Sequence, residues 1–283
     1  RMRCAWQVYK SLLPVWMRED VDKQGRETLQ ELRLRLGAPP ELILNSGSLW
    51  LDKLVREEDL KFSVNVASRY SPWASSTAAK GYITAPGGHR LGLCGEAVTV
   101  DGRMTGVRTL TSLNIRVARD FPGIARETAK HIGSILIIGK PGSGKTTLLR
   151  DMIRQRSNEY SGCVAVVDER EEIFPRADNA LCFPVGKHTD VLSGCSKSEG
   201  IEALLRCMGP DTIAVDEITD EKDCQALQEA GWCGVSVLGT AHAWDMEDLQ
   251  NRPVYHILMR SGFFRNVVVM RPDKTWRLEG VCQ

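Results

Sequence analysis

The sequence predicts an α/β fold with a mainly parallel sheet over residues 133–283, preceded by a smaller α+β domain over residues 1–118 and a linker over residues 119–132. In the C-terminal part, apolar runs alternate with segments whose apolar residues recur at helical spacing. A glycine-rich loop joins the first such run to the first helical segment. In the N-terminal part, short runs separated by turn residues indicate hairpins. Alternating strands and helices favour a parallel sheet covered on both faces, whereas hairpins form antiparallel sheets.

The N-terminal part begins with one or two helices over residues 1–28, because Trp6, Tyr9 and Leu13 recur three or four residues apart. Alternating leucines predict a strand over residues 29–36. Its outward Arg33 and Arg35 form either a solvated face or a contact for a partner or a phosphate. Residues 57–81 are expected to be mainly helical. Further strands are expected at 41–44, 82–85, 90–98, 98–100, 104–107 and 113–118, with a two-residue turn at Asp101-Gly102.

The C-terminal part alternates in the manner of a doubly covered sheet. Strands are predicted at 135–138, 163–167, 212–215, 235–240 and 264–270. Helices are predicted at 145–155, 198–208, 222–230 and 252–261, and a short helix at 124–131 in the linker. Ligands of such folds bind at the carboxyl ends of the strands, so the residues that follow each strand are the candidates for chemistry.

A phosphate-binding loop follows the first C-terminal strand. Residues 139–146 match the pattern G-x-x-x-x-G-K-[ST] between a strand and a helix. Glycines let the backbone N–H groups turn toward phosphate oxygens, and the helix N-terminus faces the same anion. Lys145 is expected to reach the β- and γ-phosphates, and Thr146 to ligate Mg²⁺. The predicted ATP-binding residues are Gly139, Lys140, Pro141, Gly142, Ser143, Gly144, Lys145, Thr146 and Thr147.

Acidic residues end two of the predicted strands. Asp216 and Glu217 follow an apolar run, as in a Walker B strand, so Asp216 is expected to hold Mg²⁺ and Glu217 to activate the attacking water. The run Asp168 to Glu172 closes another strand. Glu169 either supports the water or the metal, as a third catalytic candidate beside Glu217 and Lys145, or belongs to a solvated charged loop.

Two further sets of residues are open to more than one interpretation. Thr240 and His242 end a strand on the same side and either sense the γ-phosphate or serve the structure. Phosphoryl transfer gains from an arginine supplied across a subunit interface. Arg108, Arg116, Arg119 and Arg206 are the candidates for that arginine, and the sequence does not choose among them.

The bulk composition argues against several classes. The chain has 37 Lys and Arg against 36 Asp and Glu, a formal net charge of +1, so no nucleic-acid partner is expected. No apolar stretch approaches the roughly 20 residues that a membrane span needs.

The wider pattern resembles the stage III sporulation protein AA family. The resemblance rests on the runs ELRLRLGAPPEL, GHRLGLCGEAV, SLNIRVARDFPGIA, VVDEREEI, GKHTDVLSGCSKSEG, MGPDTIAVDEIT and GTAHA, together with the phosphate loop, over about residues 29–243. That family is similar in turn to the ATPases of type II and type IV secretion systems, within the RecA/AAA-like P-loop class. Thr219 departs from the pattern, because the family usually has glycine after Asp-Glu-Ile.

The resemblance implies an activity and a setting. It implies a hexameric ATPase that uses ATP and Mg²⁺, acts in the cytoplasm of the mother cell, and reaches the membrane through partners. These partners would be membrane-embedded components of the channel between mother cell and forespore, which the ATPase would energise during endospore formation. It also likens Asp168-Glu169 to an acidic box, Gly239 to His242 to a histidine box, and Arg116 and Arg119 to phosphate-contacting arginines. An ATP-gated assembly scaffold and a nucleic-acid motor are the alternatives.

Overall fold

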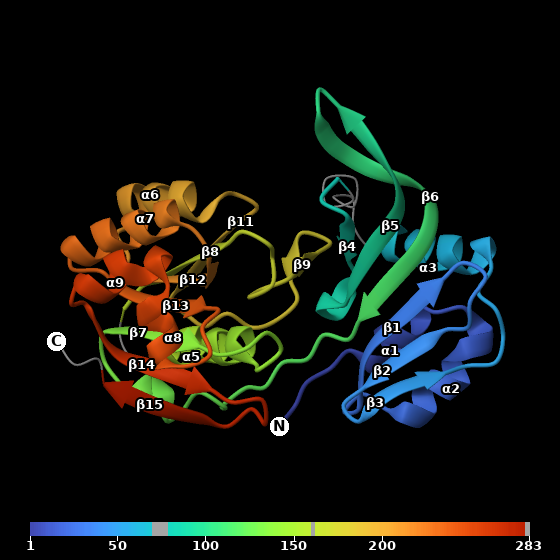
Figure 1. The fold of residues 1–283 in the computed structure, drawn as a ribbon, viewed down its shortest axis with the longest axis horizontal. Coiled ribbons are helices and arrows are strands. Elements are labelled where there is room, and N and C mark those ends of the chain that lie inside the picture. The colour runs from blue at the N-terminus through green and yellow to red at the C-terminus, as the bar shows by residue number, and fades with distance from the viewer. Residues whose placement is uncertain (70–78, 160–161, 281–283) are drawn as a thin grey trace. The chain divides into compact units, whose positions relative to one another are not determined.

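The computed structural model describes residues 1–69, 79–159 and 162–280, and the chain forms two compact units (Figure 1). The C-terminal unit comprises Phe121–Phe174 and Pro184–Gln283 together with Arg1. The N-terminal unit comprises Met2–Asp120 and Pro175–Phe183. Residues 175–183 thus belong to the N-terminal unit, although two strands of the C-terminal unit precede them in the chain. No pattern in the sequence indicates this assignment.

The C-terminal unit is built on a seven-stranded sheet in the order β11-β8-β12-β13-β7-β14-β15. Neighbouring strands from β11 to β14 are parallel, and β15 runs antiparallel to β14. The predicted mainly parallel sheet is therefore confirmed. The strands are β7 (Ser134–Ile138), β8 (Val164–Asp168), β11 (Thr189–Ser193), β12 (Thr212–Ile218), β13 (Ser236–Ala241), β14 (Phe264–Met270) and β15 (Trp276–Gly280).

Helices cover both faces of this sheet. Val167 and Val215 are buried in one apolar cluster with Leu227 of α7, and Figure 1 shows α6, α7 and α9 grouped together. The intervening Val166 and Ala214 are also fully buried and point to the opposite face, on which α5 packs. Burial on both faces is why these strands are continuous apolar runs. The helices are α5 (Lys145–Glu159), α6 (Lys197–Met208), α7 (Glu221–Trp232), α8 (Met246–Asn251) and α9 (His256–Arg260), with short 3-10 turns η3 (Thr128–Lys130) and η4 (Pro253–Tyr255).

Two strands of this unit were not predicted, and two predicted helices need correction. The strands β11 and β15 were missed because neither has the continuous apolar run of the central strands. The edge strand β11 is half-buried and polar, and β15 is also largely half-buried. The helix predicted at 252–261 is divided into η4 and α9. The helix predicted at 124–131 is wrong except for η3. Residues 122–127 form turns, in which the N–H groups of Ile124 and Arg126 donate to the carbonyls of Phe121 and Gly123. The Asp151 carboxylate holds these turns by accepting the N–H groups of Gly123 and Ala125 at 2.9 and 2.8 Å.

The N-terminal unit contains a six-stranded antiparallel sheet in the order β3-β2-β1-β6-β5-β4. Its core gathers apolar residues of the sheet and of the first helices, such as Tyr9, Leu32 and Ile115. The strands are β1 (Leu29–Arg35), β2 (Glu41–Leu44), β3 (Gly47–Trp50), β4 (Tyr82–Thr84), β5 (Arg90–Val100) and β6 (Arg103–Arg116), with the short β9 (Arg176–Ala177) and β10 (Ala180–Leu181). The helices are α1 (Trp6–Ser11), α2 (Arg18–Gln24) and α3 (Glu57–Arg69), with η1 (Val15–Met17) and η2 (Pro86–Gly88).

Most N-terminal expectations are confirmed, with differences in extent. Leu32 and Leu34 are buried as the alternation predicts, but Leu36 lies beyond the strand and is exposed. The predicted strands at 104–107 and 113–118 are one strand, β6. The strand β3 was missed because all four of its residues are exposed. The helix expected over 57–81 is confirmed to Arg69, and part of that prediction, residues 70–78, lies outside the described residues.

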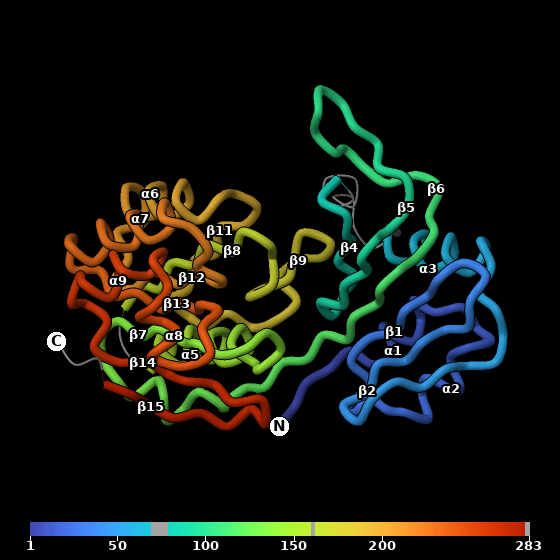
Figure 2. The backbone as a smooth tube through the Cα atoms, viewed as in Figure 1, coloured from blue at the N-terminus to red at the C-terminus, as the bar shows by residue number. Residues whose placement is uncertain are grey.

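A long hairpin extends the N-terminal sheet. β4 pairs with β5 at residues 90–92 and β1 pairs with β6 at residues 112–116, so the rest of the hairpin is a two-stranded ribbon (Figures 1 and 2). The predicted turn is confirmed, since Asp101 and Gly102 have φ of 50° and 75°, as a tight two-residue turn requires. A Cβ on Gly95 would lie 2.5 Å from the carbonyl oxygen of Thr109, so the bulge at the base of the ribbon needs glycine.

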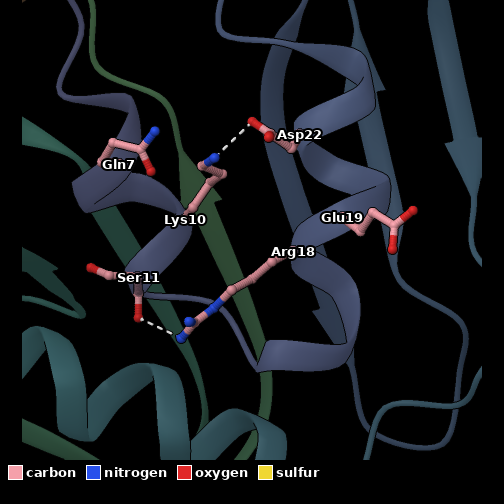
Figure 3. A pocket seen from close by; sticks show the side chains of 6 residues that line it. All are labelled: Gln7, Lys10, Ser11, Arg18, Glu19 and Asp22. Carbon is pink, nitrogen blue, oxygen red and sulfur yellow. Dashed lines mark hydrogen bonds and ion pairs between the residues drawn. The ribbon is translucent and has the colours of Figure 1, made fainter.

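Polar side chains on this unit are engaged within it. Arg33 pairs with Glu31 at 3.0 Å and Arg35 with Glu41 at 2.6 Å, beside a groove of about 320 Å³. A second groove, of about 420 Å³, lies at α1 and α2 (Figure 3), where Lys10 pairs with Asp22 at 2.9 Å. The Arg35–Glu41 and Lys10–Asp22 pairs join neighbouring elements and support a structural role for these charges, whereas the Arg33–Glu31 pair lies within β1. In the described part of the chain, no helix has the length and apolar composition to cross a membrane.

His89 is expected to make the stability of the N-terminal unit depend on pH. Its ring is fully buried, accepting the Ala118 N–H at Nδ1 (3.0 Å) and donating from Nε2 to the Ala5 carbonyl (2.9 Å). Burial lowers its pKa from 6.5 to about 4. As the pH falls below 6.5, the unfolded state gains a proton that the folded state excludes, so His89 should lower the unfolding free energy by up to about 1.4 kcal/mol per pH unit.

Urea denaturation between pH 6.5 and pH 5 measures this slope. His89→Gln should be less stable at pH 6.5, and the difference in unfolding free energy between the two proteins should shrink as the pH falls. Glutamine does not titrate, whereas other groups, such as Asp168 with its pKa of about 6, titrate in both proteins. An equal slope in both proteins would contradict the assignment of this dependence to His89.

Candidate active site

The loop between β7 and α5 has the backbone shape that its glycines predict. A Cβ on Gly139 would lie 2.9 Å from the Met270 carbonyl oxygen, and Gly142 and Gly144 have φ of 77° and 95°. Each position therefore disfavours any other residue. The Lys145 ammonium is buried and donates to the carbonyls of Gly139 (2.8 Å) and Lys140 (2.9 Å), which holds it over the loop.

Other loop residues differ in their surroundings. The Ser143 hydroxyl is buried and has no hydrogen-bond partner among the described residues. The Lys140 Nζ is exposed over the Trp244 ring, 4.3 Å from its centroid. Pro141 is exposed and Thr147 half-buried. A buried hydroxyl without a partner, inside a cradle that excludes side chains, fits a phosphate oxygen.

The sheet brings Thr146 to the acidic end of β12. Thr146 Oγ1 donates to Asp216 Oδ2 at 2.7 Å, and Thr240 Oγ1 donates to Asp216 Oδ1. Because β13 lies between β7 and β12, its last residues stand between the two predicted site strands. Thr240 is thus a structural bridge at this edge. Burial raises the pKa of Asp216, the hydrogen bonds from Thr240 and Thr146 oppose the rise, and the Glu217 and Glu172 carboxylates add to it.

Glu217 sits on an irregular backbone. Its φ is 49°, and the pairing of β12 with β13 breaks between Val215 and Ile218. Left-handed backbone at a non-glycine residue is costly and persists where neighbours fix it. Here the Glu217 N–H donates to Thr240 Oγ1 at 2.8 Å. The kink turns the Glu217 side chain to Arg170, which pairs with Oε2 at 2.6 Å, and to His242, whose Nε2 lies 3.3 Å from Oε1.

The acidic residues at the end of β8 and just after it have different roles. Asp168 is buried and accepts the backbone N–H groups of Glu172, Ile173 and Phe174 at 2.9, 3.2 and 2.7 Å, so it organises the loop. Burial raises the pKa of Asp168 to about 6 against these hydrogen bonds. Glu169 pairs with Lys197 of α6 at 2.6 Å, which neutralises its charge.

The donor set fits a magnesium nucleotide. Thr146 and Asp216 offer two oxygen ligands, and Mg²⁺ is usually bound through one or two protein oxygens together with phosphates. In the described ranges, no group of three or more His, Cys, Asp or Glu could hold a metal by itself. Burial lowers the pKa of Lys145, while Asp216 and Glu217 oppose the shift.

The sequence model for sporulation stage III, protein AA matches residues 7–282. The chain belongs to this family. Over 244 residues it is 37% identical to Stage III sporulation protein AA of Bacillus subtilis (strain 168), covering 83% of this chain and 80% of that one.

Solved structures show the fold of this family member. The Legionella pneumophila ATPase DotB matches 94% of the chain and 79% of its own length with a TM-score of 0.59 and 17% identity. The pilus retraction motor PilT with bound ADP matches 89% of this chain and 77% of its own length, with a TM-score of 0.58 and 18% identity. The predicted ATPase fold class, a mainly parallel α/β sheet after an N-terminal domain, is thereby confirmed.

The arginine candidates of this family member lie in different settings. Arg119 donates to the backbone carbonyls of Arg26 (2.6 Å) and Leu29 and to the Gln30 side chain (3.1 Å), within the N-terminal unit. Arg116 is more exposed and pairs with Glu31 at 3.1 Å. Arg108 and Arg206 form exposed pairs with Glu96 and Glu202.

One residue at the site was not among the sequence candidates. Arg170 lies within the acidic run, and nothing local in the sequence connects it to Glu217, 47 residues later. The adjacency of β8 and β12 makes the connection. A signal existed in the sequence, because Arg170 follows the end of β8 by two positions and Glu217 lies one position before the end of β12, and a parallel sheet places these strand ends at one edge.

Proposed function

We propose that the chain hydrolyses ATP with Mg²⁺. The observation that carries the proposal is the hydrogen bond from Thr146, at the start of α5, to Asp216, at the end of β12, beside the loop that holds Lys145. A phosphate cradle, a cation and a metal-binding pair at one edge of a parallel sheet are the elements of phosphoryl transfer.

Each side chain then has a defined task. The amides of residues 139–144 and the Lys145 ammonium bind the phosphates, and Ser143 and Thr147 add hydroxyl groups. Thr146 and Asp216 hold Mg²⁺, which offsets phosphate charge when bound. Glu217 accepts a hydrogen bond from the attacking water and orients it. Thr240 holds the backbone of Glu217 and the carboxylate of Asp216, and His242 contacts the Glu217 side chain. Glu169 acts through the loop that it anchors to Lys197.

The cellular role follows as part of the same proposal. The name of the Bacillus subtilis relative supports a role in sporulation, and the fold shared with DotB and PilT supports a motor. We infer a homo-oligomer, as a hexameric ring, in the mother-cell cytoplasm. It engages membrane-embedded channel components and converts hydrolysis into force on them. Arg116 or Arg119 would supply the arginine at a neighbouring subunit's phosphates.

Steady-state hydrolysis against protein concentration tests the proposal, with the mass of the assembly measured alongside. The rate per chain should rise as the ring forms. In Glu217→Gln the rate should fall by about 100-fold or more, because the variant loses the group that orients water. Binding of a fluorescent ATP analogue should persist in this variant, because Glu217 is not in the phosphate cradle.

Two results would contradict the proposal. Tight ATP binding and ring formation without turnover, even with membranes of sporulating cells added, would indicate an ATP-gated scaffold. A rate stimulated by DNA and lost at high salt would indicate a nucleic-acid motor.

A further inference from the structure

Arg170 engages the carboxylate to which the proposed function assigns the attacking water. Its Nη1 lies 2.6 Å from Glu217 Oε2, in hydrogen-bond geometry. The Arg170 side chain is 60% exposed and that of Glu217 is 24% exposed, so the pair lies at an open edge of the sheet. An exposed ion pair usually contributes little to stability, so its position calls for another explanation.

The loop that presents Arg170 is fixed from inside the unit. Asp168 accepts three backbone N–H groups of residues 172–174. The buried Arg150 of α5 donates to the carbonyls of Ile173 and Glu172. The loop is thus tied to the helix that begins at Lys145 by the contacts of Asp168 and Arg150.

Residues on both sides of Arg170 are also held. Glu169 pairs with Lys197, which lies 3.5 Å from Asp223 of α7. Glu171 has a left-handed φ of 55°, and its N–H donates to the Asp168 carbonyl at 3.2 Å. A backbone fixed on both sides places the Cα of Arg170 at a defined position, from which the guanidinium reaches the Glu217 carboxylate.

Without Arg170, Glu217 would be held by its backbone and by the contact of one carboxylate oxygen with His242. Its N–H donates to Thr240 and Asp216, but its carboxylate is carried on three rotatable bonds. The ion pair with Arg170 and the contact with His242 orient the two carboxylate oxygens. Each oxygen has two lone pairs, so both contacts leave room for a hydrogen bond from water.

We propose that Arg170 is a positioning residue: it holds the Glu217 carboxylate in the orientation that receives the attacking water. This inference rests on the proposed function. Arg170 also offsets negative charge where Asp216, Glu217 and Glu172 would otherwise face a triphosphate. Orientation matters most here, because phosphoryl transfer is accelerated mainly by positioning and electrostatics.

Kinetics of Arg170→Ala, Arg170→Lys and the double variant with Glu217→Gln test this role. Arg170→Ala should lower kcat about tenfold to a hundredfold, because the carboxylate loses its fixed orientation, and should change the KM for ATP less than about threefold. Arg170→Lys should restore part of kcat, since it keeps the charge but not the planar fork. In the Glu217→Gln background, Arg170→Ala should cause no further loss of kcat, because Arg170 acts through Glu217.

Arg252→Ala is the matched control. It removes a half-exposed ion pair with Asp248 of α8 and should not change kcat.

The outcomes separate this inference from the proposed function. If the wild type hydrolyses ATP and Arg170→Ala matches or exceeds its rate, the inference is overturned and the proposed function stands. An additive loss in the double variant also overturns it, because Arg170 would then act independently of Glu217. If the wild type shows no turnover, the proposed function fails. The pairing is then judged by thermal unfolding, where non-additive Tm shifts of about 1 °C are expected and additive shifts would overturn it.

Discussion

Replacing Lys145 with alanine should weaken ATP binding by about 100-fold or more and leave no measurable turnover. Lys145 is 6% exposed, and two carbonyls hold its ammonium over the phosphate loop. A charge-assisted hydrogen bond contributes about 1.5–3 kcal/mol, and every 1.4 kcal/mol is about tenfold in affinity, so losing two such bonds to phosphate oxygens accounts for the effect.

Titration with a fluorescent ATP analogue in the presence of Mg²⁺ measures the change. Lys222→Ala removes an exposed lysine of α7 and serves as the control, with circular dichroism to verify that both variants fold. Wild-type affinity in Lys145→Ala would show that nucleotide, if bound, occupies another place.

Replacing Asp168 with alanine should lower the unfolding free energy by about 3 kcal/mol, because three backbone N–H groups would lose their acceptor. The Ile173 and Phe174 side chains are fully buried, so water does not readily replace the carboxylate. Burial opposes the charged form of Asp168, as its raised pKa shows, so the loss is smaller than three separate hydrogen bonds to a charge would give.

Urea denaturation compared with Glu202→Ala measures this loss. Glu202 belongs to an exposed pair on α6, and its removal should cost no more than about 0.5 kcal/mol. A loss below about 1 kcal/mol in Asp168→Ala would show that the loop after β8 does not depend on this carboxylate.

The phosphate loop could be predicted because its signal is local. A strand, glycines at positions with left-handed φ or close contacts, and a helix follow one another within residues 134–159, so sequence order and spatial order coincide. The alternation of apolar strands and helices predicted the parallel sheet for the same reason. Since parallel strands end at one edge, it also predicted that Thr146 and Asp216 would meet.

The irregular elements could not be predicted with the same certainty. The edge strand β11 and the exposed β3 have no apolar alternation, and the turns before η3 are held by the Asp151 carboxylate, which accepts the N–H groups of Gly123 and Ala125. Such contacts join residues far apart in sequence, and composition within a window does not report them.

By itself, the sequence determined the fold class, the phosphate loop and the chemistry available at the strand ends, because these depend on periodicity and on residue types in fixed local order. Only the tertiary structure decided how the site is assembled. The insertion of β13 between β7 and β12 makes Thr240 a bridge, and the adjacency of β8 and β12 joins Arg170 to Glu217. Strand order in a sheet is set by packing of the whole unit, so the partners of each strand-end residue are fixed only when the sheet forms.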